Sequence, residues 1–597
     1  MPRTNPRRKT LSAVAALLTL ATAGASQVLV ARGGHARSSV VVAENASDTE
    51  RQAARELALF LHLTTGGEFP VLNAAPDSGS RLLVGEGAAR LADPSFAASS
   101  LRPEEILIRS AGRDLILAGG SPRGTLYAVS AFLEDFVGCR WWTPEAGNIP
   151  WRPTLKIGPT DVRFAPPLEY REPFWYAAFD DVWSARNKAN GIRSGGNDLY
   201  GGRQVYEGFV HTFYSLIPPD RYFKDHPEWF SEIDGRRTGE NAQLCLTNEE
   251  MRRELVKNLE ERLRANPKAT IASVSQNDCF NPCACPRCRA VDADEGSPSG
   301  LLLRFVNAVA ADIEREFPGV AIDTLAYQYT RKPPRIARPR ANVIVRLCSI
   351  ECAFSRPLDD ARNAAFFDDL KGWSAIADRL YVWDYTTNFA HYIQPHPNLG
   401  VLGPNIRLFV RNKVRGVFEQ GAYQSWGSEM AELRSWMLAK LLWNPSLDPS
   451  ALRREFIRGY YGPAAGPVAA FLDVLDEAVR RAGDDLGCYA PTEAKFLSLD
   501  TALRSWALLR KAERRAAGIA AYARRVKRAR LPVAYVVLAK WDALRNEAQD
   551  RKLPWPWPAD RAELLKWFLE AARAEGVTMI SEWQTLDDWA NKGGRVR

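Results

Sequence analysis

The sequence predicts a (β/α)8 TIM barrel with a small α/β domain before it and an α-helical domain after it. From residue 165 to residue 428, short apolar runs alternate with amphipathic helical stretches, which is typical of parallel strands joined by right-handed crossovers. About eight such units in roughly 250 residues match the size of a closed barrel. The whole chain of 597 residues suggests about three domains. A doubly wound open sheet is the structural alternative.

Residues 1–26 have the pattern of a twin-arginine export signal. Arg7 and Arg8 precede an apolar run from Leu11 to Ala21, and small residues follow that run. The run is too short to span a bilayer as a permanent helix, and no other stretch is long enough. We therefore expect an exported protein, periplasmic or extracellular, with no membrane span. A cytosolic protein with a frayed N-terminus is the alternative.

Residues 38–160 are expected to form the small α/β domain. A β-branched run at residues 39–43 precedes an amphipathic helix at residues 49–65, and a second helix at 121–136 follows two glycines. Residues 120–128 and 138–142 resemble the N-terminal domain of α-glucuronidases and the analogous domain of hexosaminidases. In those enzymes such a module packs against a barrel.

Eight runs are candidate barrel strands, at residues 169–176, 209–214, 242–246, 269–275, 321–327, 342–348, 380–383 and 414–418. Helical stretches lie between several of them, at residues 248–264, 299–317, 357–379 and 403–413. After residue 427 helical patterns dominate, and residues 429–597 are predicted to form the helical domain.

Composition narrows the class of partner. The net charge of +9 is spread along the chain and accompanies no nucleic-acid-binding motif. The 18 tryptophans and 18 tyrosines suit stacking against sugar faces as well as core packing. A glycan is therefore the expected partner, no cofactor is expected, and the sequence does not indicate an oligomeric state.

In a (β/α)8 barrel, function collects where the strands end at the carboxyl face. The predicted strand ends are rich in carboxylates, amides and aromatic rings, and the candidates are Trp183, His211, Asn277, Asp278, Tyr327, Glu351, Asp384, Tyr385, Glu419, Tyr423 and Trp426. Each has a structural alternative. For Asp278 it is capping of the following loop by Asx hydrogen bonding, for Glu351 a salt bridge, and for Trp183 and Trp426 core packing.

Glycoside cleavage needs an acid that protonates the leaving oxygen and a second group at the sugar ring. When that group is the substrate's own acetamido oxygen, the enzyme needs one general acid and a polar side chain that orients the amide. We expect Asp278 or Glu419 to be the acid and Asn277 to orient the amide, with support from Glu351 and Asp384. The aromatic candidates and His211 would line the sugar cleft.

Four of the nine cysteines crowd into one loop: Cys279, Cys283, Cys285 and Cys288. Disulfides would stiffen this loop in an exported protein, and this is the favoured interpretation. Zinc bound by the four thiolates is the alternative, although the spacing is tighter than in the usual paired knuckles.

The barrel resembles the DUF4838 family, assigned to glycoside hydrolase family 163. The matching motifs are residues 226–230, 244–248, 275–278 with Cys285 and Cys288, 295–300, 305–307, 349–352 and 440–445. The resemblance implies endo-β-N-acetylglucosaminidase activity on N-glycans, with the substrate acetamido group as nucleophile. An α-glucuronidase-like enzyme with a carboxylate pair, and a non-catalytic glycan-binding protein, are the alternative functions.

Overall fold

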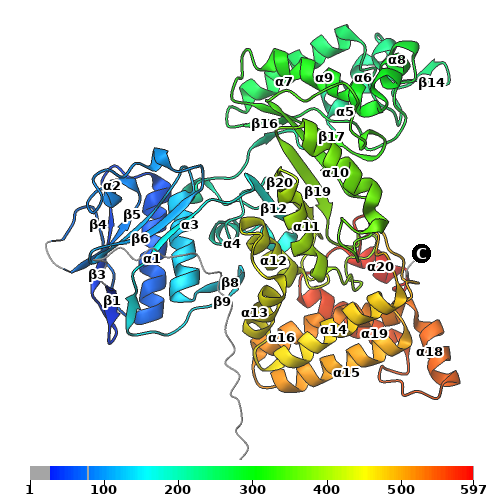
Figure 1. Ribbon diagram of the computed structural model, residues 1–597. Coiled ribbons are helices and arrows are strands. Elements are labelled where there is room, and N and C mark those ends of the chain that lie inside the picture. The colour runs from blue at the N-terminus through cyan, green and yellow to red at the C-terminus, as the bar shows by residue number, and fades with distance from the viewer. Residues whose placement is uncertain (1–26, 77–78, 596–597) are drawn as a thin grey trace, which may run out of the picture. The chain divides into compact units, whose positions relative to one another are not determined.

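The computed structural model describes residues 27–76 and 79–595, which form two compact units (Figure 1). The first unit contains the chain up to Cys139 together with Ile149–Ala165, and the second contains Arg140–Asn148 and the chain from Pro166 onward. The export signal predicted for residues 1–26 lies outside the described residues. No described helix combines the length and the apolar character that crossing a bilayer requires.

The first unit is a six-stranded mixed sheet with helices on it. The strands follow the order β11-β6-β7-β5-β3-β4, with bounds β3 (Ser38–Val42), β4 (Val71–Leu72), β5 (Ser80–Val84), β6 (Ile106–Ala111), β7 (Asp114–Gly119) and β11 (Asp161–Phe164). A smaller sheet joins β1 (Val28–Arg32), β2 (His35–Ala36) and β10 (Leu155–Ile157). The two predicted helices are α1 (Asp48–Thr65) and α3 (Gly124–Phe132). A capping box between Ser47 and Glu50 begins α1.

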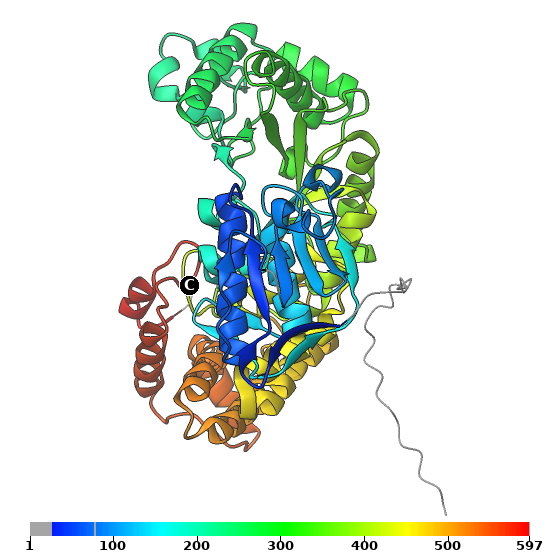
Figure 2. The same cartoon turned by 90° about the vertical axis from the view of Figure 1, so that its left-hand side faces the viewer.

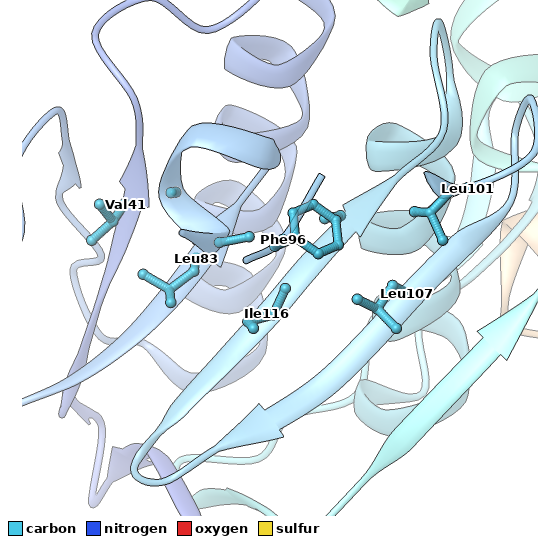
Figure 3. Close-up of a cluster of buried hydrophobic side chains, with 9 residues drawn as sticks. Val41, Leu83, Phe96, Leu101, Leu107 and Ile116 are labelled. Atoms are coloured by element: carbon cyan, nitrogen blue, oxygen red, sulfur yellow. The ribbon is translucent and has the colours of Figure 1, made fainter. Parts of the chain in front are cut away.

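One face of this sheet carries a closed apolar cluster, drawn in Figure 3. Val41, Leu83 and Ile116 come from neighbouring strands, and Phe96 and Leu101 come from the segment after the short helix α2 (Glu86–Ala89). Because alternate residues of a strand point to opposite faces, the same strands also supply the apolar residues of the other face.

The second unit is built on a sheet of seven parallel strands in the order β12-β20-β19-β18-β17-β16-β13. Their bounds are β12 (Tyr170–Phe174), β13 (Tyr206–Glu207), β16 (Ile271–Ser273), β17 (Ala321–Ala326), β18 (Val343–Cys348), β19 (Leu380–Tyr385) and β20 (Val414–Gln420). The first strand in sequence lies beside the last, which is the order of a (β/α)8 barrel. The predicted fold class is therefore confirmed.

Helices connect the strands of this sheet or follow from its loops. They are α4 (Asp181–Arg186), α5 (Phe213–Leu216), α6 (Pro219–Tyr222), α7 (Glu249–Ala265), α8 (Pro286–Glu295), α9 (Pro298–Ile313), α10 (Ala364–Ile376) and α11 (Leu399–Arg411). Short hairpins join β8 (Arg140–Thr143) to β9 (Ala146–Asn148), and β14 (Glu232–Ile233) to β15 (Arg236–Arg237).

Two of the eight predicted strands are wrong. Residues 209–214 contain no strand, because His211 has a left-handed φ of 54° and the strand lies earlier, at β13. Residues 242–246 contribute only an isolated bridge from Leu244 to Phe230. In this segment the Gln243 side chain bonds the main chain of the loop after β16, at Asn277 and Cys279.

Asn190 takes the place of a neighbouring strand beside β12. Its Oδ1 accepts a hydrogen bond from the Arg171 N–H at 2.8 Å, and its Nδ2 donates to the Glu169 carbonyl at 2.9 Å. Its own N–H donates to the Arg171 carbonyl at 3.2 Å. The side chain is fully buried, so the amide completes hydrogen bonds of β12 that the described strands leave open.

Replacing Asn190 with alanine is expected to lower the free energy of unfolding by about 2–4 kcal/mol, because the Arg171 N–H and the Glu169 carbonyl would be left without the amide. Denaturant unfolding followed by circular dichroism measures the change. Asn591→Ala, at an exposed position, is the matched control and should shift stability by less than about 0.5 kcal/mol. Equal effects of the two substitutions would contradict the strand-like role of Asn190.

A buried ion pair fills the interior of the barrel. Arg346 of β18 donates to Asp323 of β17 at 2.8 Å, and both side chains are about 1% exposed or less. Aromatic rings surround the guanidinium, among them Tyr170 and Phe209 at 5.4 and 5.0 Å from ring centroids. The interior is thus packed at this level by the ion pair and the rings around it.

Helices make up the rest of the second unit. They are α12 (Ala431–Trp443), α13 (Pro449–Tyr461), α14 (Ala465–Ala482), α15 (Leu499–Ala516), α16 (Ala520–Ala529), α17 (Leu531–Ala539), α18 (Trp541–Asp550), α19 (Arg561–Ala574) and α20 (Leu586–Asn591). Figures 1 and 2 show these helices, coloured yellow to red, gathered away from α7 and α9. They belong to the same compact unit as the barrel, and their separation as a domain at residue 429 stays a prediction.

Candidate active site

A cavity of about 340 Å³ lies at the carboxyl ends of the barrel strands. Leu325, Cys348, Trp383 and Phe418 belong to four neighbouring strands and line it. Leu325 and Cys348 each come two residues after a member of the buried ion pair, so the cavity lies one layer of side chains above that pair. This is the place at which (β/α)8 barrels carry their active sites.

Aromatic rings form most of the wall. They are Phe174, Phe209, Tyr327, Trp383, Tyr385, Phe389, Phe418, Tyr423 and Tyr489. Such walls bind ring-shaped ligands with apolar faces, while a few polar groups fix the orientation of the ligand. Here the titratable polar groups besides the tyrosines and Cys348 are His211, Asp278 and Glu582.

Asp278 stands on the loop that leaves β16. The Tyr327 hydroxyl donates to Asp278 Oδ1 at 3.2 Å, and the Gln328 Nε2 donates to the Tyr327 oxygen at 3.1 Å. Burial and the charge of Asp278 raise the pKa of Tyr327, which therefore remains a hydrogen-bond donor near neutral pH. Asp278 itself is exposed to solvent, so its carboxyl group is open to a ligand.

Glu582 provides the second carboxyl group of the cavity. The Tyr423 hydroxyl donates to Glu582 Oε1 at 3.3 Å. The backbone is held by a bond from the Glu582 N–H to the Phe389 carbonyl at 2.8 Å and by the Gln424 amide at 3.2 Å. Burial raises the pKa of Glu582, the Tyr423 hydroxyl opposes this, and the charge of Asp278 adds to it.

His211 faces the cavity with a defined tautomer. Its Nδ1 lies 2.8 Å from the Gln276 carbonyl oxygen, and a carbonyl can only accept, so Nδ1 carries the proton. In this tautomer Nε2 is left as a hydrogen-bond acceptor. His211 has a left-handed backbone, and its ring lies against the loop that follows β16, at Gln276.

Asn277 does not have the role predicted for it. Its Nδ2 donates to the Ala242 carbonyl at 2.8 Å, and its Oδ1 accepts from the Tyr214 N–H at 3.2 Å. Both ends of the amide are therefore bonded to the main chain, and Asn277 is not among the residues that line the cavity. It holds the loop that carries Asp278.

Glu419 and Asp384 do not line the cavity, contrary to the prediction. On β20, Phe418 and Gln420 line the cavity, and Glu419 between them points to the other side of the strand. Asp384 has the same parity on β19, between Trp383 and Tyr385. Both carboxyl groups are buried. Burial and the neighbouring Asp384 raise the pKa of Glu419 well above 4.5, and burial raises the pKa of Asp384 to about 6.

Three further predicted residues lie outside this cavity. Glu351 is exposed and pairs with Arg331 at 2.8 Å. Trp183 is 2% exposed, and its Nε1 donates to the Trp141 carbonyl at 3.1 Å, so it packs in the core. Trp426 lines a different cavity of about 470 Å³, which contains several arginines, among them Arg528 paired with Glu575.

Five predicted site residues do converge on the cavity: Asp278, His211, Tyr327, Tyr385 and Tyr423. The structure adds lining residues that were not among the predicted site residues. Several belong to the barrel strands, whereas Phe389, Tyr489 and Glu582 lie beyond the strands. The last two come from the helical part of the chain, where no strand end and no motif marks them.

Glu419→Gln is expected to raise stability at neutral pH and to leave turnover unchanged. The pKa of Glu419 is raised in the folded protein, so above about pH 4.5 the unfolded chain releases a proton that the folded chain retains. The free energy of unfolding of the wild type therefore falls as pH rises from about 4.5 to the pKa that Glu419 has in the folded protein. Glutamine does not titrate, so the variant does not lose this stability.

Thermal unfolding of the wild type and Glu419→Gln between pH 4 and pH 8 measures this difference, which should grow with pH. Glu261→Gln, exposed on α7, is the matched control and should run parallel to the wild type. If Glu419→Gln is less stable than the wild type at every pH, Glu419 is not protonated in the folded protein.

The cysteines of the loop do not form the favoured disulfides, since all nine cysteines of the chain are free. Cys283, Cys285 and Cys288 are joined by Cys245, which comes from residues before α7, and Cys279 lies outside this group.

Comparison with known proteins identifies the family. The model of the "Domain of unknown function (DUF4838)" family matches residues 141–473. A search of curated proteins finds no match. Among solved structures, the chain is similar to BtGH115A, described as a family GH115 4-O-methyl-α-glucuronidase with specificity for decorated arabinogalactans. The TM-score is 0.61 at 10% identity, over 93% of this chain and 78% of that one.

Two other solved structures are similar at lower scores. CpGH84B has a TM-score of 0.48 at 10% identity, over 96% of this chain and 98% of its own. A mutant Streptomyces plicatus β-hexosaminidase in complex with GlcNAc has a TM-score of 0.44 at 14% identity, over 74% and 93%. Similarity to BtGH115A at 10% identity shows a fold and not an activity. The family model covers more than half of the chain, and the protein therefore belongs to the DUF4838 family.

Proposed function

We propose that this protein is a glycoside hydrolase whose active site is the aromatic cavity at the carboxyl ends of the barrel strands. The observation that carries the proposal is the presence of two carboxyl groups, from Asp278 and Glu582, in the wall of that one cavity. Hydrolysis of a glycosidic bond needs a proton donor for the leaving oxygen and a second group at the anomeric carbon or beside it.

Glu582 is the proton donor in this proposal. Its raised pKa keeps a larger fraction of the carboxyl group protonated near neutral pH than an ordinary glutamate would have. Asp278, held by the Tyr327 hydroxyl, is the acceptor that orients the reacting group of the substrate. The role predicted for Asn277 thus passes to Asp278, because the Asn277 amide is bonded to the main chain.

We propose a neutral sugar as the substrate, specifically a β-linked N-acetylhexosamine. Lysine and arginine are absent from the described residues that line the cavity. A uronate would therefore bring its carboxylate beside Asp278 and Glu582 without a cation to offset the repulsion. An acetamido group suits the site better, because its methyl group can pack on aromatic rings while its N–H donates to a carboxylate.

The reaction would proceed in two steps with retention. Glu582 gives its proton to the glycosidic oxygen while the acetamido oxygen bonds to the anomeric carbon, so the glycosidic bond breaks and the leaving sugar departs as an alcohol. Asp278 accepts the hydrogen bond of the acetamido N–H. Water then adds to the anomeric carbon, the bond to the acetamido oxygen breaks, and Glu582 takes the proton from that water. The finer proposal is endo-cleavage of N-glycans by an exported enzyme.

The direct test is incubation of the purified protein with aryl β-N-acetylglucosaminide, aryl β-glucoside, aryl α-glucuronide and a panel of N-glycans, with products read by mass spectrometry. We expect release from the acetamido-sugar substrates and none from the glucuronide. Turnover of the glucuronide alone would replace this proposal with the α-glucuronidase alternative. Tight binding of glycans without any turnover would favour a binding protein.

A further inference from the structure

Four cysteine side chains meet at one point in the second unit. The sulfur atoms of Cys245, Cys283, Cys285 and Cys288 all lie within 4.8 Å of one another, and all four residues are buried. Cys245 Sγ is 3.8 Å from Cys285 Sγ and 3.8 Å from Cys288 Sγ. A disulfide would bring two sulfurs to about 2.05 Å, so these thiols are not bonded in pairs.

The spacing of the four sulfurs suits one metal ion bound between them. A zinc ion bound by four thiolates at about 2.3 Å places the sulfurs at the corners of a tetrahedron with edges of about 3.8 Å. Two of the six Sγ–Sγ distances, at 3.8 Å, equal this edge, and all six are within 4.8 Å. The apolar side chains of Leu246, Val291 and Leu301 pack against the cysteines.

The groups around the sulfurs suit thiolates. The Glu232 N–H donates to Cys283 Sγ at 3.3 Å, and the Arg237 guanidinium donates to the same sulfur at 3.5 Å. The Thr247 hydroxyl lies 3.3 Å from Cys288 Sγ. Donors of this kind stabilise metal-bound thiolates, and the positive charge of Arg237 offsets the excess negative charge of four thiolates around one ion.

We propose that Cys245, Cys283, Cys285 and Cys288 bind a structural Zn²⁺ ion. Four soft sulfur ligands in a tetrahedron select zinc or iron, and a site with all four positions filled by protein leaves none for substrate or water. Cys279, which lies in the same loop, is not a ligand because it is outside the sulfur cluster.

The site would brace the loop that carries Asp278. Gln243, two residues before Cys245, accepts from the Asn277 N–H at 2.8 Å and donates to the Cys279 carbonyl at 2.7 Å. The ion would join Cys245 to the far end of that loop at Cys283, Cys285 and Cys288. Both ends of the loop around Asp278 would then be fixed to the same short segment.

Metal content and thiol count together test the proposal on the full chain. The protein is purified without metal-affinity resin, and its metals are measured by inductively coupled plasma mass spectrometry. We expect about one zinc per chain. In denaturant with chelator and no reductant, all nine cysteines should react with a thiol reagent. Two disulfides within the cluster would leave five reactive thiols, since they remove four of the nine.

Serine substitutions distinguish the cysteines that bind the ion from a cysteine of the same loop that does not. Cys245→Ser and Cys288→Ser should each lower the zinc content at least tenfold, and Cys279→Ser should retain it. Should the ligand variants fail to fold, cobalt exchanged into the wild-type protein gives a second measurement, because tetrahedral cobalt thiolates absorb in the visible range.

A wild-type protein without zinc, or with five reactive thiols, would overturn the proposal, as would iron in place of zinc. Zinc retained by Cys245→Ser would overturn the ligand set. These measurements do not depend on turnover, so the zinc site and the proposed activity can fail independently of each other.

Discussion

Glu582→Gln is expected to lower kcat/KM on a natural glycan by about 10²–10⁴-fold, which is the contribution of a general acid. Glutamine keeps the size of the side chain and can still accept from the Tyr423 hydroxyl, but it has no proton to give to the leaving oxygen. The substitution thus removes the chemistry with little change to the cavity wall. Initial rates on an N-glycan, followed by chromatography of the released sugar, measure the effect.

The pH dependence gives a second measure of the same residue. Glu582 must be protonated to act, and burial raises its pKa. Wild-type activity should therefore fall as pH rises through that pKa, and Glu582→Gln should lose this alkaline decline together with most of the rate. Tyr423→Phe should shift this decline to higher pH, because the Tyr423 hydroxyl lowers the pKa of Glu582 and the substitution removes that hydroxyl.

Leaving groups provide the control. The phenol of an aryl glycoside leaves without being protonated when that phenol is acidic. The Glu582→Gln variant should therefore retain much of the wild-type rate on such a substrate and lose most of the rate on the glycan. An equal loss on both substrates would mean that Glu582 positions the sugar and does not supply the proton. An unchanged rate on the glycan would remove Glu582 from the catalytic machinery.

Most of the barrel could be predicted because its strands are local patterns. The runs that became β16, β17, β18, β19 and β20 are apolar, β-branched and followed by turn residues, so period and composition identify them. The region between β12 and β16 could not be predicted in this way. There one strand is two residues long, and Asn190 supplies hydrogen bonds that a strand would otherwise make.

The candidate site was predicted only in part, for two physical reasons. Glu419 and Asp384 were chosen by their nearness to strand ends, but parity along the strand decides which side of the sheet a side chain faces, and a shift of one residue reverses it. Glu582 and Cys245 depend on long-range packing. Glu582 is brought to the cavity by bonds to Phe389 and Gln424, and nothing near it in sequence indicates those partners.

Asp278→Asn is expected to lower kcat on acetamido-sugar substrates by about 10²–10³-fold. Asparagine is similar in size and keeps an oxygen for the Tyr327 hydroxyl, but it lacks the negative charge that strengthens the hydrogen bond to the acetamido N–H as positive charge develops there in the transition state. Because the bond gains its strength mainly in the transition state, the loss should appear in kcat and much less in KM. Steady-state kinetics on aryl β-N-acetylglucosaminide measures both constants.

Two comparisons make this result specific to the cavity. Glu351→Gln removes an exposed carboxylate that pairs with Arg331 outside the cavity, and it should leave kcat within about twofold of the wild type. An aryl β-glucoside lacks the acetamido oxygen that acts as nucleophile, so neither the wild type nor Asp278→Asn should release its phenol. If the Asp278 variant keeps full activity, or if Glu351→Gln is the more damaging change, the active site does not lie where β16 and the C-terminal segment meet. The catalytic carboxylates would then have to be sought in another cavity of the second unit.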